Sequence, residues 1–114
     1  MLFILNDPPY GSERSYNGLR LAGTLARRPG NEVHVFLIGD AVACATKAQK
    51  TPQGYYNIEV MLKGLARASA VTGVCGSCMD ARGMTQEGLV DGTHRSSMDE
   101  LAEWTEWADK VSVF

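Results

Sequence analysis

Two cysteines at one predicted turn carry the strongest chemical signal in the sequence. Cys75 and Cys78 follow the β-forming stretch Val71–Val74, and Gly83 is placed to end what comes after them. This pattern predicts a short buried strand that turns at once into one or two helical turns. A thiol at the start of a helix lies among unsatisfied N–H groups, which favour its thiolate. The sequence therefore indicates thiolate chemistry at this turn.

Arg82 is the third candidate residue at the same turn. If a helix begins near Cys75, helical spacing places Cys78 and Arg82 on one face, while Asp80 points elsewhere. At about 1.5 Å per residue, Arg82 lies roughly 10 Å from Cys75, which is too far for a direct ion pair. We expect Arg82 to favour the thiolate by its charge, or to bind an anionic substrate or a neighbouring subunit. The structural alternative is that it neutralises the C-terminal end of its own helix.

The Cys-x-x-Cys spacing is compatible with several classes of site. A redox dithiol, half of a metal site, a sulfur-carrying pair and two buried inert thiols all fit it. A structural zinc site needs about four ligands, and besides the pair the chain offers only His94 and Cys44. A thioredoxin-like domain fits less well, because its motif usually follows an early strand. The sequence therefore predicts neither a metal nor another cofactor.

Five other residues have simpler structural roles as alternatives to a function in the site. Cys44 lies among alanines and is expected in the core, and His34 alternates with valines, where a histidine is usually packed rather than a ligand. His94, in a polar stretch near the cysteines, stays a candidate for a functional role. Tyr55 and Tyr56 are expected to anchor their loop, or to contribute to a lid or a subunit contact.

Composition is typical of an ordinary globular protein. The 114 residues, 45% hydrophobic and 21% charged, predict a single domain spanning residues 1–114 with a sizeable core. The net charge of −2 provides no excess of positive charge for direct binding of nucleic acid or of a membrane surface. Neither a signal peptide nor a membrane span is expected, and three cysteines do not suggest a disulfide framework, so the expected location is cytoplasmic.

Apolar strands and helical stretches alternate along the chain. Strands are expected at Leu2–Asn6, Glu32–Gly39, Val71–Val74 and Val111–Phe114. Between them, Ser12, Asp40, Asn57 and Ser97 are placed to cap helices, and residues 84–95 are turn-rich. This order predicts an α/β fold with a mostly parallel sheet and helices on both faces. Because sites in such sheets form at the carboxyl ends of strands, the cysteine turn, Asn6–Gly11 and Gly39–Asp40 are expected to converge on one rim.

Nearly the whole chain resembles the DsrE/DsrF-like family of sulfur-relay proteins, which includes the TusD subunit of a tRNA-thiolation relay. The resemblance is carried by the apolar first strand followed by Pro8-Pro9-Tyr10-Gly11 and by the polar stretch ending Gln49-Lys50-Thr51-Pro52. It is carried further by Val74-Cys75, by Arg82-Gly83, and by the ending Asp109-Lys110-Val111-Ser112-Val113-Phe114.

The resemblance implies a three-layer α/β/α sandwich with a mostly parallel five-stranded sheet. It also implies that Cys75, at the end of the third strand, accepts sulfane sulfur as a persulfide and hands it on between donor and acceptor proteins. Assembly as a homotrimer or a hexamer is implied too. Cys78 departs from the single-cysteine relay subunits, so the alternatives are a dithiol–disulfide redox protein using both cysteines and an oligomeric adaptor whose cysteines are incidental.

Overall fold

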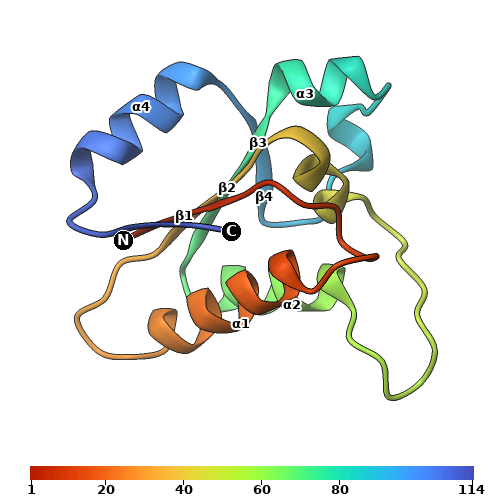
Figure 1. Cartoon of the computed structure of the whole chain (residues 1–114), viewed down its shortest axis with the longest axis horizontal. Coiled ribbons are helices and arrows are strands. Elements are labelled where there is room, and N and C mark those ends of the chain that lie inside the picture. The colour runs from red at the N-terminus through yellow and green to blue at the C-terminus, as the bar shows by residue number, and fades with distance from the viewer.

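Alternating strands and helices assemble into three layers around a parallel sheet. The computed structural model describes residues 1–114. Its strands are β1 (Leu2–Leu5), β2 (His34–Leu37), β3 (Val71–Cys75), β4 (Thr93–Ser96) and β5 (Val111–Val113). Its α-helices are α1 (Arg14–Ala26), α2 (Ile58–Arg67), α3 (Gly76–Ala81) and α4 (Met98–Trp107). Two 3₁₀ helices, η1 (Gly39–Ala45) and η2 (Gln86–Gly88), complete the chain. The first two α-helices cover one face of the sheet, and the last two lie on the other (Figure 1).

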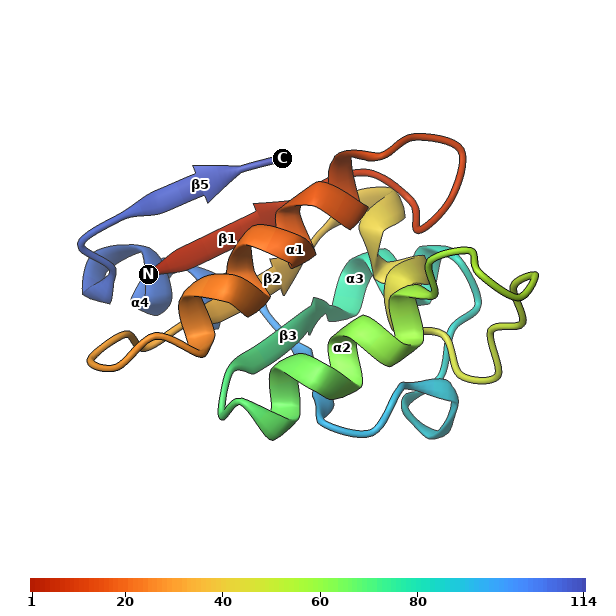
Figure 2. The same cartoon turned by 90° about the horizontal axis from the view of Figure 1, so that it is seen from below.

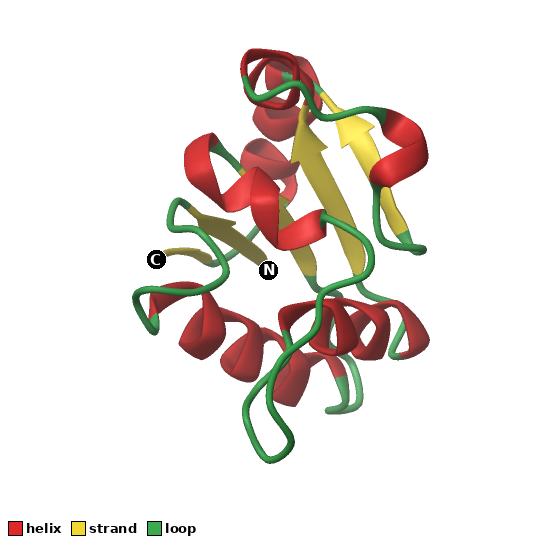
Figure 3. Ribbon diagram, turned by 90° about the vertical axis from the view of Figure 1, so that its right-hand side faces the viewer, coloured by secondary structure: helices red, strands yellow, loops and turns green.

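All five strands are parallel, in the order β4-β3-β2-β1-β5. The last strand lies at one edge beside the first, and in the view from below α1 and α2 lie in front of the sheet (Figure 2). Turning the molecule shows the helices separated into two groups by the strands (Figure 3). The predicted α/β sandwich with a five-stranded sheet is therefore confirmed.

The fourth strand is the element that the sequence pattern did not predict. Residues 93–96, which were expected to be turn-rich, pair with β3 from Thr72↔Thr93 to Cys75↔Ser96. Their side chains are all polar and none is fully buried, because the strand forms an edge of the sheet. An edge strand of this kind lacks the apolar run by which buried parallel strands are recognised.

Helix capping follows the sequence in α2 and α4 and departs from it in α1. The Asn57 side chain accepts a hydrogen bond from Val60 N at 3.1 Å, and the Ser97 hydroxyl accepts one from Glu100 N at 3.2 Å. The N-cap of α1, in contrast, is Glu13, one residue after Ser12, whose hydroxyl donates to Asp7 Oδ2 at 2.7 Å and accepts from Arg14 N at 3.4 Å. None of the helices is both long and apolar enough to cross a membrane.

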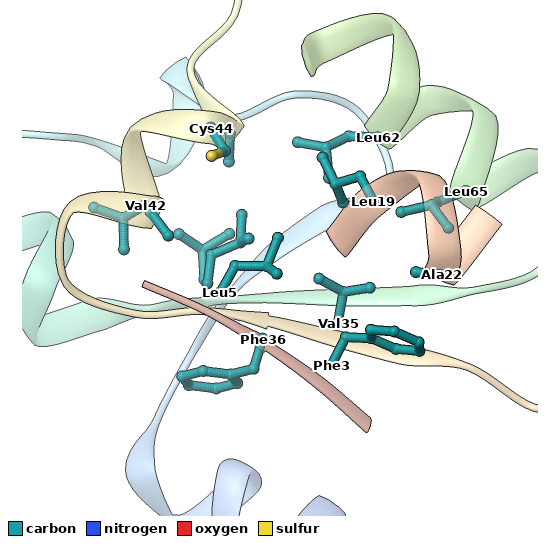
Figure 4. Packing of buried hydrophobic residues seen from close by; sticks show 14 of the residues in the cluster. Phe3, Leu5, Leu19, Ala22, Val35, Phe36, Val42, Cys44, Leu62 and Leu65 are labelled. Atoms are coloured by element: carbon teal, nitrogen blue, oxygen red, sulfur yellow. The ribbon is translucent and has the colours of Figure 1, made fainter. Parts of the chain in front are cut away.

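The core lies on both faces of the sheet. Side chains from α1 and α2 pack on the strands from one side, among them Leu19 and Leu62 (Figure 4). Phe36 points to the opposite face, where its ring meets the Trp104 ring edge-to-face with centroids 6.1 Å apart. Trp104 comes so close to β3 that a Cβ on Gly73 would stand 3.0 Å from its ring, so glycine allows α4 to pack here. This packing fixes the end of β3, from which the cysteine turn begins.

Candidate thiol site

Cys75 is the last residue of β3 and the N-cap of α3, as the sequence predicted. Its side chain is only 4% exposed, whereas Cys78, one turn further along α3, is partly exposed. The helix ends at Ala81, with Arg82 as its C-cap just before Gly83, whose φ of +66° favours glycine. A buried strand therefore holds the first thiol in place, and a short helix carries the second beside it.

Hydrogen bonds around Cys75 favour its thiolate. The Cys75 sulfur lies 3.4 Å from the Ser77 hydroxyl oxygen. Burial alone raises the pKa of Cys75, but hydrogen bonds from the side chains and backbone N–H groups of Cys78 and Ser77 more than offset it. The pKa of Cys75 is therefore lower than that of an ordinary cysteine.

Cys78 has the opposite character. Burial raises its pKa, and a hydrogen bond to the Cys75 sulfur and the charge on that sulfur raise it further. The N–H group of Gly39 donates to Cys78 Sγ at 3.2 Å and, with the charge of Arg82, acts in the other direction without reversing the shift. The two thiols are thus distinct in chemistry, since the thiolate forms more readily on Cys75 than on Cys78.

Two of the three loops that were expected to converge meet directly at this turn. Gly39, at the start of η1, contacts Cys78 through the N–H donor described above. The Asn6–Gly11 loop lies against Gly39, with Asn6 O 3.9 Å from where a Gly39 Cβ would stand, and the carbonyl of Asp7 accepts a hydrogen bond from the buried Cys44 thiol at 3.7 Å. The loop after β1 therefore supports the η1 loop, which in turn contacts the thiol site.

Arg82 joins α3 to η1. Its guanidinium donates to Asp40 Oδ1 from Nη2 at 2.7 Å and from Nε at 3.2 Å, and from Nη1 to the Cys78 carbonyl at 3.1 Å. The bond to the Cys78 carbonyl satisfies one acceptor at the C-terminal end of α3, as the structural alternative for Arg82 supposes. The positive charge of Arg82 is therefore paired with the Asp40 carboxylate rather than with either cysteine thiol.

Arg95 is the basic side chain at the site that the sequence did not indicate. It extends from β4 over the first residue of α3 and pairs with both carboxylate oxygens of Asp80, at 2.8 and 2.9 Å. A Cβ built on Gly76 would lie 2.9 Å from three atoms of its guanidinium. Pairing of β4 with β3 brings Arg95 here, so recognising that strand was the signal needed to find it.

The remaining residues weighed in the sequence lie in other surroundings. His94 contacts the Glu100 carboxylate, and His34 packs between the rings of Trp104 and Trp107. Cys44 is fully buried, and burial raises its pKa to about 12. No group of three His, Cys, Asp or Glu side chains is placed to hold a metal ion.

Four tyrosines, including the two in the predicted loop, form one aromatic cluster. Tyr56 stacks on Tyr55 and on Tyr16, with ring centroids 4.4 and 4.2 Å apart, and it lies beside Tyr10. The Tyr10 hydroxyl donates to Gln49 Oε1 at 2.6 Å. These contacts anchor the loop between η1 and α2, although the Tyr55 side chain stays 53% exposed.

The chain is similar over nearly its whole length to several known proteins. The model of the DsrE/DsrF-like family matches residues 1–114. Protein YchN of Escherichia coli is 39% identical over 115 residues, covering 100% of this chain and 97% of that protein. Its crystal structure superposes with a TM-score of 0.91, at 38% identity over 99% of this chain and 97% of that one. An uncharacterized protein of Methanocaldococcus jannaschii, MJ0989, is 38% identical, covering 97% of this chain and 96% of the other.

Proposed function

The chain belongs to the DsrE/DsrF-like family, and we propose that it carries sulfane sulfur as a persulfide on Cys75 and passes it to a partner. The family is linked to sulfur relay, which indicates that the chemistry proposed for this site is sulfur transfer. The observation that supports the proposal most is the lowered pKa of a nearly buried thiol at the end of β3. A carrier needs such a thiolate both to attack and, later, to leave.

The proposed reaction has two displacement steps. The Cys75 thiolate attacks the outer sulfur of a donor persulfide, the donor S–S bond breaks, and the donor leaves as a thiolate. An acceptor thiolate then attacks the outer sulfur on Cys75 and takes it away, so the Cys75 thiolate is released unchanged. A low pKa suits both steps, since it populates the nucleophile and makes Cys75 a better leaving group.

A dithiol–disulfide redox function is the second candidate, because Cys78 lies within hydrogen-bonding reach of Cys75. In that reaction the Cys78 thiolate attacks the inner sulfur of the Cys75 persulfide. A Cys75–Cys78 disulfide forms, the terminal sulfur leaves as hydrosulfide, and an external thiol must reduce the pair. The raised pKa of Cys78 makes this attack slow at neutral pH, which favours the carrier function. A third possibility, an adaptor with incidental cysteines, requires Cys75 to be unreactive.

Cyanide trapping separates these functions. The protein is incubated with inorganic polysulfide, freed of excess reagent and exposed to cyanide, which removes sulfane sulfur from a persulfide as thiocyanate. The carrier function predicts one added sulfur atom by intact-protein mass spectrometry and about one equivalent of thiocyanate. Recovery of only a disulfide-bonded protein with no thiocyanate would identify the redox function, and an unmodified protein would identify the adaptor.

Replacing Cys78 by serine is expected to lengthen the lifetime of the loaded state. The change removes the one thiol placed to displace the sulfur from Cys75, while serine retains a small polar side chain beside it. The decay of the added sulfur, followed by mass spectrometry, should slow severalfold, and raising the pH should accelerate decay only in the wild type. If Cys78→Ser could not be loaded while Cys75→Ser could, the assignment of roles to the two cysteines would be wrong.

We also propose that donor and acceptor proteins approach a homotrimer or a hexamer of two trimers. Several large apolar side chains remain exposed on the single chain, including Met98 at 61%, Val113 at 66% and Trp107 at 43%. With Tyr55 on the loop between η1 and α2, they provide apolar surface of the kind that subunit contacts cover. Multi-angle light scattering at micromolar concentration should return three or six times the chain mass of 12.4 kDa. A monomer mass would contradict this assembly.

A further inference from the structure

Two arginine–aspartate pairs flank helix α3, and they differ in where they place their charge. Arg82 binds Asp40 beyond the C-terminal end of the helix, 2.7 Å away. Arg95 binds Asp80, 2.8 Å away, across the side of the helix next to Cys75. The two arginine side chains are similarly exposed, at 35% and 40%. Position therefore distinguishes the pairs better than burial does.

The guanidinium of Arg95 lies directly on the backbone of Gly76. A Cβ at residue 76 would stand 2.9 Å from Cζ, Nε and Nη2 alike, so the flat face of the group covers this residue. Gly76 is helical and has no positive φ, so the backbone conformation does not require glycine here. A Cβ at this position would instead displace the guanidinium, which lies on the residue next to the one that bears the thiol.

The positive and negative groups of the Arg95–Asp80 pair lie at different positions along α3 relative to Cys75. Its positive group lies over Gly76, which follows Cys75, whereas the carboxylate belongs to Asp80, one helical turn further along the chain. The hydrogen bonds and charge of Asp80 raise the pKa of Arg95, and the Cys75 thiolate adds to that effect. The positive end of the pair therefore lies at Gly76, the residue after Cys75, and its negative end comes from a residue further along the helix.

We propose that Arg95, seated on Gly76, is the positioned cation that stabilises the anionic forms of Cys75, and that Arg82 is not. This inference deepens the proposed function and rests on it, because the anions concerned are the thiolate before loading and the persulfide after it. A cation at this place also favours donors whose reacting sulfur is attached to an anionic group. Arg82, with its donors directed to Asp40 and to the Cys78 carbonyl, stabilises the end of α3 instead.

Other charged groups near Cys75 are already paired. From η1, Asp40 faces Arg82. From α4, the Glu100 carboxylate accepts a hydrogen bond from Ser96, the register partner of Cys75, and it also contacts His94. From α3 itself, Cys78 is the remaining titratable neighbour. Of the cations among these groups, Arg95 is the one that lies over the residue next to the thiol.

The test measures the pKa of Cys75 directly, without sulfur transfer. Rates of alkylation by iodoacetamide are followed against pH in a Cys78→Ser background, so that Cys75 is the reactive thiol. Arg95→Ala should raise the apparent pKa by about 0.5, the size expected for one charge across a partly solvated gap. Arg95→Lys should recover much of this change, and Gly76→Ala, which displaces the guanidinium, should resemble Arg95→Ala.

Two further variants separate charge from damage to the helix. Asp80→Asn keeps an oxygen that can accept from Arg95 but removes the opposing charge, so it should lower the pKa of Cys75. Arg82→Ala is the matched control at the other end of α3 and should leave that pKa within error. An unchanged pKa in Arg95→Ala, an equal rise in Arg82→Ala, or a rise in Asp80→Asn would overturn the proposal. Sulfur loading of the wild type is measured separately. The proposed role of Arg95 can therefore be wrong while the carrier function is right, and the carrier function can be wrong while the role of Arg95 is right.

Discussion

Replacing Cys75 by serine is expected to abolish sulfur loading. Serine preserves the size and the hydrogen bonds of the side chain at the end of β3, but an alcohol is neither ionised near neutral pH nor able to form a persulfide. No other thiol can take its place, since the pKa of Cys78 is raised and Cys44 is fully buried. Intact-protein mass spectrometry after exposure to polysulfide should therefore show no added sulfur.

Cys44 provides the control for this experiment. Its thiol is buried, and burial raises its pKa to about 12, so it carries almost no thiolate under the loading conditions. The Cys44→Ala variant should accept sulfur at the wild-type rate. Loading of Cys75→Ser at a rate like that of the wild type would show that sulfur is held elsewhere, and the proposed carrier role would be wrong.

Replacing Phe36 by alanine is expected to cost about 3–5 kcal/mol of the free energy of unfolding. Phe36 is fully buried on β2, in the middle of the sheet, and it packs against Trp104 of α4. Its removal leaves a cavity between the sheet and the helix, which the surrounding layers can fill only in part. For a domain of this size, whose total stability is about 5–15 kcal/mol, such a loss is a large fraction.

Urea denaturation followed by tryptophan fluorescence measures this loss. Val60→Ala is the control, because Val60 lies on α2 with 58% of its side chain exposed and should lose less than about 0.5 kcal/mol. If Phe36→Ala unfolded at nearly the wild-type urea concentration, the packing of α4 on the sheet described above would be incorrect.

The fold could be predicted largely from sequence because its central strands are apolar throughout. The stretches that became β1 and β2 are buried on both faces, and their continuous apolar runs are a strong signal. Asn57 marks the start of α2 by a side-chain cap that the structure shows. The prediction failed at β4, since an edge strand with polar side chains has no apolar run, and its pairing depends on β3.

The same failure limited what could be predicted about the site. Cys75, Cys78 and Arg82 are close in sequence, so helical spacing sufficed to place them at one turn. Arg95 is twenty residues from Cys75 and reaches the site only through the pairing of β3 with β4. The partner of Arg82, Asp40, likewise comes from η1, which follows another strand. Local spacing identifies the nucleophile, whereas tertiary contacts determine which charges act on it.

Locating the transferred sulfur tests the central claim most directly. Wild-type protein is loaded briefly with inorganic polysulfide, its thiols and persulfides are capped with iodoacetamide, and the fragment that contains both Cys75 and Cys78 is sequenced by tandem mass spectrometry. If Cys75 is the carrier, the additional sulfur atom is expected on Cys75, with Cys78 and Cys44 carrying none. Additional sulfur on Cys78 alone, or on neither residue of the pair, would contradict it.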